Sequence, residues 1–352
     1  MIGAWSGKLD QILAGGNDFL DLYGGGRLAH DPGLYNPDTI RRVEVETAGM
    51  SGDAFLFSRP PVVAALLWPL ARLPYRAAYF TFQALAVLAV ALAVWIWPVR
   101  EQRGAIALAC CWSFPLSTAF ANGQDIPFLL LWLSLAVRLM ERRPVLAGLI
   151  GSLCISKFHL FLLLPIWIIT MKRWRFGAGL LGGLACSAAA SFALQGPDWI
   201  QRYLQLVRNP IEDTDEALMR NLHGLCSSLK FPLVLELALC GAVAWAVWRA
   251  CRTAPENAWL ATLAGSILVS RHAYTQDCAI LLPVLVATLL AEEKGFPLRI
   301  LAGILLLPVL YLPALTLPGP AAVLPAAMSA VVVMCWLSKP ARKALAGPPP
   351  AI

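Results

Sequence analysis

Long apolar runs constrain this chain more than any other feature. A membrane-spanning helix needs about 20 mainly apolar residues, and this length is reached by Tyr75–Val99, Phe176–Gln195, Phe231–Arg249, Pro297–Leu317 and Gly319–Leu337. The composition agrees, because only 14% of the residues are charged, against about 25% in soluble domains. The sequence therefore predicts an all-α, polytopic membrane protein.

Shorter and interrupted apolar runs bring the expected bundle to about 11 transmembrane or broken helices. The expected spans are 75–99, 104–120, 125–140, 144–156, 158–171, 176–195, 230–249, 257–270, 275–291, 297–317 and 319–337. The runs within 104–171 are short for a full crossing, so we expect broken or tilted helices there.

The connections between the spans differ in charge and so predict the orientation. One set is short and basic, and Lys and Arg near span ends are typical of cytoplasmic loops. This set holds Arg100 and Arg103; Arg138, Arg142 and Arg143; Lys172, Arg173 and Arg175; Arg249 and Arg252; Lys294 and Arg299; and Lys339, Arg342 and Lys343. The other connections contain more acidic than basic residues, so we expect them on the opposite face of a bacterial inner (plasma) membrane.

This orientation divides the chain into three parts. Residues 1–74 form an extracytoplasmic N-terminal loop with short amphipathic helices, 75–338 form the transmembrane bundle with its external loop 196–229, and 339–352 form a cytoplasmic tail. No run before Pro60 is apolar enough to span, so we expect a further transmembrane helix upstream of the present first residue. Within the external loop, Trp199, Tyr203 and Leu206 recur at helical spacing, which predicts a helix lying in the membrane interface.

Several function classes are excluded by composition and motifs. The net charge of +7 comes from basic residues clustered between apolar runs, where membrane orientation explains them, so we expect no nucleic-acid partner. Most of the nine cysteines lie within apolar runs and are interpreted as packing residues. Phosphate-loop, zinc-protease and nucleophile-elbow motifs are absent, and Gly24–Gly26 lacks the flanking strand of a nucleotide loop. We expect no cofactor and no metal, although four histidines in the connections assigned to the outer face leave a metal as an alternative.

Polar residues gather in the connections assigned to the outer face. They are Asp18 and Asp21; Asn122, Gln124 and Asp125; Lys157 and His159; Asn221 and His223; and Arg271, His272, Tyr274 and Asp277. Each has an ordinary explanation as well: Asp18 and Asp21 as solvated acids, Asp125 as a helix cap and Lys157 as a snorkelling side chain. Polar groups near hydrocarbon are costly unless they pair or line a wet cavity, so their joint occurrence favours a site.

The order of these motifs resembles glycosyltransferase family 87, the polyprenol-phosphate-mannose-dependent α-1,2-mannosyltransferases of the GT-C superfamily. The matching segments are Asp18-Phe19, Tyr23 and Gly26-Arg27-Leu28; Leu34-Tyr35-Asn36-Pro37; Arg59-Pro60-Pro61, where the family has Tyr-Pro-Pro; Asn122-Gly123-Gln124; Ala147-Gly148 with Lys157; and His272, Tyr274 and Asp277. The chain departs from the family after Lys157, where Phe-His-Leu replaces a common Pro.

The resemblance implies inverting transfer of mannose or a similar sugar from a polyprenyl-phosphate donor to a hydroxyl of a lipid or glycan acceptor. It implies Asp18 as catalytic base, with Asp21 as the substitute candidate. Lys157, Arg271 and His272 would hold the donor phosphate, and Arg59, His159, Asp277, His223, Asn122, Gln124, Asn221 and Tyr274 would complete the substrate-binding set. The partners expected are the donor, the acceptor and membrane lipid. A transporter or flippase of a lipid-linked substrate is the alternative, since its broken helices and polar residues would look similar.

Overall fold

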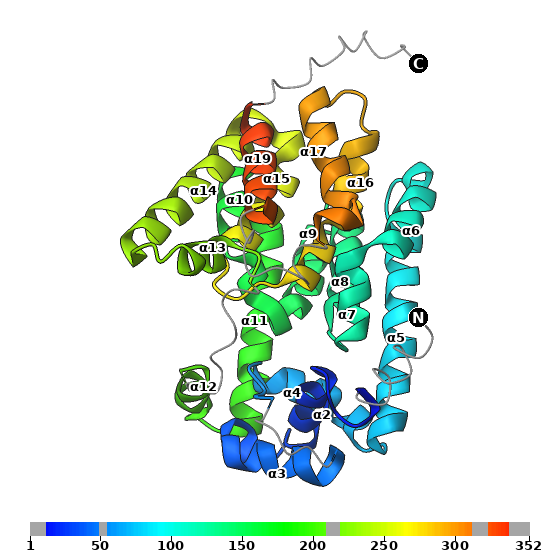
Figure 1. Cartoon of the computed structure of the whole chain (residues 1–352), viewed down its shortest axis with the longest axis vertical. Coiled ribbons are helices and arrows are strands. Elements are labelled where there is room, and N and C mark those ends of the chain that lie inside the picture. The colour runs from blue at the N-terminus through cyan, green and yellow to red at the C-terminus, as the bar shows by residue number, and fades with distance from the viewer. Residues whose placement is uncertain (1–11, 49–54, 209–218, 312–322, 338–352) are drawn as a thin grey trace.

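In the computed structural model every regular element is helical across the described residues, 12–48, 55–208, 219–311 and 323–337. Figure 1 shows α2 (Phe19–Arg27), α3 (Pro37–Ala48) and α4 (Pro61–Ala71) gathered at one end of the molecule. A short 3-10 helix, η1 (Pro32–Tyr35), links α2 to α3. The expected tail, 339–352, lies outside the described residues.

The all-helical expectation is confirmed for these residues, and part of the expected span set is present. In the part of the chain that the structure describes, four helices are long and apolar enough to cross a membrane: α5 (Tyr75–Ile96), α9 (Pro144–Gly151) continuing into η3 (Ser152–Phe161), α11 (Trp174–Gln195) and α14 (Leu233–Thr253). A fifth is possible if η2 (Arg100–Gln102) and α6 (Arg103–Trp112) form one broken span with α7 (Phe114–Ala121), across a bend of 56°.

The other expected spans coincide with shorter helices, so the count of about 11 stays a prediction. These helices are α8 (Ile126–Leu139), α10 (Leu164–Thr170), α15 (Ala258–Val269), η7 (Thr275–Leu281) with α16 (Leu282–Leu290), α17 (Phe296–Leu306) and α19 (Val323–Leu337). Besides α12 (Trp199–Val207), the shorter connecting elements are α13 (Leu222–Ser228), η6 (Pro255–Asn257) and η8 (Pro308–Leu310). The broken geometry expected for 104–171 is found, but 144–161 forms one candidate span where we expected two.

Three of the basic connections contact one another, as expected for loops on one side of a membrane protein. Arg138 donates to the carbonyl oxygen of Ile96 at 3.1 Å, and Arg173 forms an ion pair with Glu141 at 2.8 Å. These contacts join the turns after α5, α8 and α10. The grouping predicted from charge is therefore consistent with the arrangement of the helices.

Glycines allow α9 and α11 to touch backbone to backbone. A Cβ on Gly148 would lie 2.1 Å from the carbonyl oxygen of Phe176, and one on Gly179 would lie 2.0 Å from that of Val145. Small residues at such contacts are typical of helix packing in membranes, where close van der Waals contact replaces the hydrophobic drive. This contact anchors η3, which follows α9 and carries Lys157.

We expect Gly179→Ala to destabilise the protein by at least about 1–3 kcal/mol, because its Cβ meets a backbone atom that cannot move aside. Thermal unfolding of the detergent-purified protein measures this loss. Gly182→Ala is the matched control on the same helix, since the nearest atom to its Cβ is a flexible Leu149 methyl at 4.0 Å. Equal melting temperatures for both variants would contradict the packing role of Gly179.

The glycine run 24–26, which the sequence left without a role, is a packing surface of α2. A Cβ on Gly25 would lie 2.2 Å from the Phe57 ring, and one on Gly26 would lie 2.8 Å from the Cβ of Ala71 in α4. The end of α11 is joined to the same group, because Gln195 donates to the carbonyl oxygens of Ala29 and Asp31 at 3.1 and 3.0 Å. The N-terminal helices are thus held against the bundle.

The helix expected in the external loop exists as α12 (Trp199–Val207), but its predicted apolar face is directed at the protein. Leu206 is buried, and the ring of Tyr203 lies 5.6 Å from that of Tyr35 in η1. The face that stays exposed carries Ile200, Leu204 and Val207. The helix itself is confirmed, and its position in the membrane interface stays a prediction, because spacing alone cannot tell which apolar stripe meets the protein.

Candidate functional site

The turn between α7 and α8 brings Gln124 to Asp18. Gly123 has φ +67, a conformation that glycine adopts readily, and a Cβ there would lie 2.6 Å from the Cβ of Phe19. Asn17 donates across the same contact to the carbonyl oxygen of Ala121 at 3.3 Å. In this arrangement Gln124 Nε2 donates to Asp18 Oδ2 at 2.5 Å. Asp18 is half-buried, and this hydrogen bond uses one of its two carboxylate oxygens.

Arg59 lies between two further acids, Asp21 and Asp125. It forms a buried ion pair with Asp21, and its Nε lies 3.9 Å from Asp125 Oδ2. The guanidinium also lies over the ring of Phe57, 5.9 Å from its centroid. Burial raises the pKa of Asp21 to about 6, although the Arg59 charge opposes the shift. Asp21 is therefore paired directly with a cation, whereas Asp18 accepts a hydrogen bond from a neutral amide and interacts with the Arg59 charge from further away.

Asp125 lies in this cluster, although the substrate-binding set implied by the resemblance did not include it. The ordinary explanation was a cap of α8, but its side chain makes no capping hydrogen bond. Both of its oxygens are buried without a hydrogen-bond partner. In a sequence, an acid just before the first turn of a helix is normally interpreted as a cap. Only the position of Arg59 in the fold shows that Asp125 is instead a partner of an arginine.

A second buried ion pair joins η3 to η7. Lys157 has non-helical dihedrals inside η3, φ −132 and ψ 49, and this break directs its Nζ to Asp277 Oδ1 at 3.0 Å. The other oxygen, Oδ2, accepts from the backbone amide of Tyr274 at 2.8 Å. Asp277 is fully buried and Lys157 nearly so. Lys157 is therefore not a snorkelling side chain but one half of an internal pair.

Aromatic side chains lie beside this pair. The rings of His159 and His272 are perpendicular at 5.9 Å, and those of His272 and Tyr274 at 5.0 Å. Burial lowers the pKa of His272 to about 4, and the charges of Lys157 and Arg59 act in the same direction. His272 is therefore neutral at neutral pH and offers hydrogen bonds rather than positive charge.

The two ion-pair groups form one electrostatic unit, since Arg59 of the first influences His272 of the second. The unit also holds six of the thirteen buried side-chain polar atoms that lack a hydrogen-bond partner among the described residues. They are Asp21 Oδ1, Arg59 Nε, Gln124 Oε1, both oxygens of Asp125 and His159 Nε2. Buried polar atoms are normally paired, so this concentration suits the binding of a polar ligand such as a sugar.

The remaining predicted residues lie around this centre. Asn221 is buried and structural, because it donates to the carbonyl oxygen of Ser270 at 2.7 Å and accepts from the amide of Gly224 at 2.8 Å. His223 Nδ1 lies 3.0 Å from Glu236 Oε1. Asn122 is half-buried and Arg271 is exposed. The structure thus brings together the three acids Asp18, Asp21 and Asp125, the cations Arg59 and Lys157, and the segment 272–277. It leaves Arg271 at the surface.

Glu44 is a second residue that the sequence assignment omitted. Both of its oxygens lie 3.1 Å from the backbone nitrogen of Phe55, which donates to them, and Glu44 is buried. Burial raises its pKa to about 8, and the Asp21 charge adds to the shift. Glu44 follows buried Ile40 by four residues, so an acid in the apolar stripe of α3 was the available signal.

Comparison with known proteins identifies one family. The model described as glycosyltransferase family 87 matches residues 57–271. This range contains Arg59, Gln124, Asp125 and Lys157, whereas Asp18, Asp21 and the 272–277 segment lie outside it. No curated protein matches, and no solved structure matches.

Proposed function

Because this chain belongs to glycosyltransferase family 87, we propose that it moves a sugar, mannose or a similar one, from a polyprenyl-phosphate donor to a hydroxyl of a lipid or glycan acceptor. We place the reaction at the extracytoplasmic face of a bacterial inner membrane. In an inverting transfer the acceptor oxygen forms a bond to the anomeric carbon, the bond to the phosphate oxygen breaks, and the acceptor proton passes to a base. The polyprenyl phosphate leaves with the electron pair.

The observation that carries the proposal is the hydrogen bond between Asp18 and Gln124. It lies beside two buried ion pairs, Arg59–Asp21 and Lys157–Asp277. A catalytic base needs an accessible carboxylate that can take a proton during attack. Asp18 meets this need, because only one oxygen accepts from Gln124 and the residue is half-buried. Asp21 is less suited, since Arg59 occupies it. We therefore assign the base to Asp18 and a positioning role to Asp21.

Charge on the departing phosphate needs cations or hydrogen-bond donors. Lys157 is already compensated by Asp277, whereas Arg271 is exposed next to His272. We assign Arg271 to the charge of the donor phosphate, and neutral His272 to a hydrogen bond with the same phosphate. We assign the Lys157–Asp277 pair to holding the segment 272–277 in place. Gln124 Oε1 and the two Asp125 oxygens, which lack a hydrogen-bond partner among the described residues, are suited to sugar hydroxyls.

The direct test supplies membranes containing the protein with a radiolabelled polyprenyl-phosphate mannose and follows label into the glycolipid and glycan fractions. We expect transfer that depends on the chain, and loss of the same product from a deletion strain by mass spectrometry. Label that crosses the membrane without forming a new glycosidic bond would indicate a transporter. Absence of both outcomes with several polyprenyl-phosphate sugars would contradict the donor class.

The orientation has its own test. Reporter fusions after Arg143, Arg175 and Arg252 should report a cytoplasmic location, because basic connections stay inside. Fusions after Asp125 and Pro210 should report the opposite side. A cytoplasmic signal after Asp125 would place Gln124 and Asp18 on the wrong face for a lipid-linked donor presented outside.

A further inference from the structure

The segment 270–274 connects α15 to η7 and carries Arg271 and His272, which we assigned to the donor phosphate. It contains no helix, so its conformation depends on hydrogen bonds to other parts of the chain. Ser270 and Ala273 are buried, whereas Arg271 is exposed and His272 is half-buried. Two buried anchors therefore flank the two residues that we assigned to the phosphate.

Both anchors are held by the residues just before α13. Asn221 Nδ2 donates to the carbonyl oxygen of Ser270 at 2.7 Å, and the backbone amide of Arg220 donates to the carbonyl oxygen of Ala273 at 3.0 Å. Buried carbonyl groups are normally paired, and here the partner of Ser270 lies 49 residues earlier in the chain. We call these two hydrogen bonds the loop clamp.

Ser270 adds a contact within the segment itself. Its hydroxyl oxygen accepts from the backbone amide of His272 at 3.3 Å. Further along, the amide of Tyr274 donates to Asp277 Oδ2 at 2.8 Å. The backbone is thus fixed before Arg271 by Ser270 and after His272 by Asp277.

The loop clamp is built on a helix that is itself held in place. Asn221 caps α13, because its Oδ1 accepts from the amide of Gly224 at 2.8 Å. On the same helix, His223 Nδ1 lies 3.0 Å from Glu236 Oε1 of α14. Asn221 is fully buried, and both ends of its amide group are in use. One side chain therefore joins α13 to the segment 270–274.

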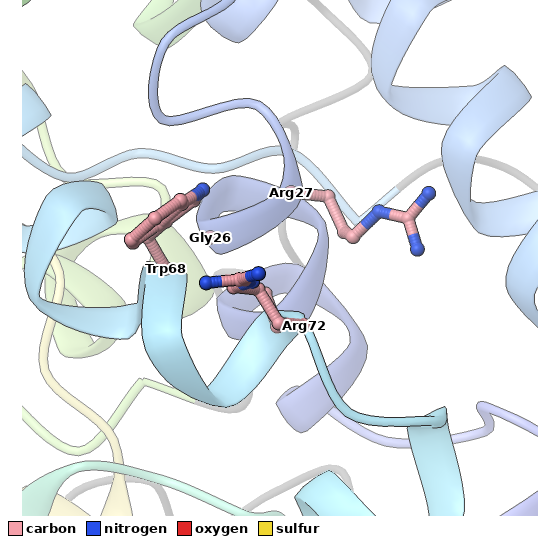
Figure 2. Close-up of a pocket in the computed structure, with 5 residues that line it drawn as sticks. Gly26, Arg27, Trp68 and Arg72 are labelled. Atoms are coloured by element: carbon pink, nitrogen blue, oxygen red, sulfur yellow. The ribbon is translucent and has the colours of Figure 1, made fainter.

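The side chain of Arg271 lacks the contacts that hold other arginines of this chain. Figure 2 shows Arg72 beside Trp68 at the end of α4, where the guanidinium lies 5.1 Å from the centroid of the indole. Arg173 is paired with Glu141. Among the described residues, no hydrogen bond, ion pair or ring contact involves the side chain of Arg271. Its backbone alone decides where its guanidinium is presented.

We propose that Asn221 and Ser270 are positioning residues, which hold Arg271 and His272 in place for the phosphate of the donor. This inference rests on the proposed function. Asn221 then acts on the donor through the backbone of 270–274 rather than by binding substrate itself. Binding groups need such supporting hydrogen bonds, because a displacement of about 1 Å is enough to lose much of an interaction.

The variant Asn221→Ser tests the loop clamp. Serine caps a helix about as well as asparagine but has no amide group to donate to Ser270. We expect the KM for polyprenyl-phosphate mannose to rise by about 5–10-fold, as for the loss of one hydrogen bond, with a change in kcat of at most about twofold. Hydrogen-exchange mass spectrometry of the detergent-purified chain without substrate should show faster exchange of the peptide 270–277.

Ser228→Ala is the matched control in the same helix. It removes the hydrogen bond from Ser228 Oγ to the carbonyl oxygen of Gly224, 2.6 Å long, and leaves the loop clamp intact. It should therefore keep both the wild-type KM and the wild-type exchange of 270–277. An equal rise in KM in Ser228→Ala would overturn the proposal, because any weakening of α13 would then have the same effect.

Unchanged exchange of 270–277 in Asn221→Ser would overturn the loop clamp, and faster exchange with an unchanged KM would overturn its role in donor binding. A wild type that transfers no sugar from any polyprenyl-phosphate donor would instead contradict the proposed function, while the exchange data would still show whether the loop clamp exists. If Asn221→Ser does not fold, Ser270→Ala replaces it. That variant removes the acceptor of the His272 amide, and the same rise in KM is expected.

Discussion

Replacing Asp18 with asparagine should lower sugar transfer by about 10²–10⁴-fold, the usual contribution of a general base. The substitution keeps the shape of the side chain and an oxygen that can accept from Gln124, while it removes the group that takes the acceptor proton. Donor binding should survive, so the loss should appear in kcat rather than in KM. Turnover of a supplied polyprenyl-phosphate mannose by membranes with matched protein levels measures it.

The control for this prediction is Asp38→Asn, an exposed acid of the same N-terminal segment. It should leave transfer unchanged. Asp21→Asn is not a suitable control, because it leaves the buried Arg59 without its ionic partner and is expected to disturb the site through folding. Full activity of Asp18→Asn would remove Asp18 as the base while leaving the family assignment intact.

The second large effect concerns the Lys157–Asp277 pair. Lys157→Ala should destabilise the protein by about 3–5 kcal/mol, because it leaves a buried carboxylate without its cation. The amide of Tyr274 offsets only part of this cost. Thermal unfolding in detergent measures the loss, and an unchanged melting temperature would show that Asp277 is adequately solvated without Lys157.

A double variant separates stability from function at this pair. Lys157→Met combined with Asp277→Asn removes both charges and keeps similar volumes, so it should recover most of the stability lost in Lys157→Ala. Transfer should remain impaired, because the 272–277 loop loses the contact that positions it. Recovery of full transfer along with stability would reduce the pair to a structural element.

The sequence by itself determined the class of the protein and supplied many of the residues that we propose for the site. Apolar runs of sufficient length predict helices in a membrane because lipid offers no hydrogen bonds to an open backbone. The helical class and four long apolar helices follow from this rule. The ordered motifs were sufficient to predict the family. The same residues also indicated that Asp18, Gln124, Arg59, Lys157 and Asp277 share a site.

Tertiary structure alone decided which of these residues pair. The Asn-Gly-Gln turn was visible in the sequence, but its partner was not. The contact of Gly123 with Phe19 brings Gln124 to Asp18 and joins segments more than 100 residues apart. Asp125 looked like a cap until Arg59 lay beside it. Lys157 looked like a snorkelling residue until the break in η3 turned it towards Asp277. Local patterns fix local conformation, whereas an ion pair depends on where the whole chain places its two partners.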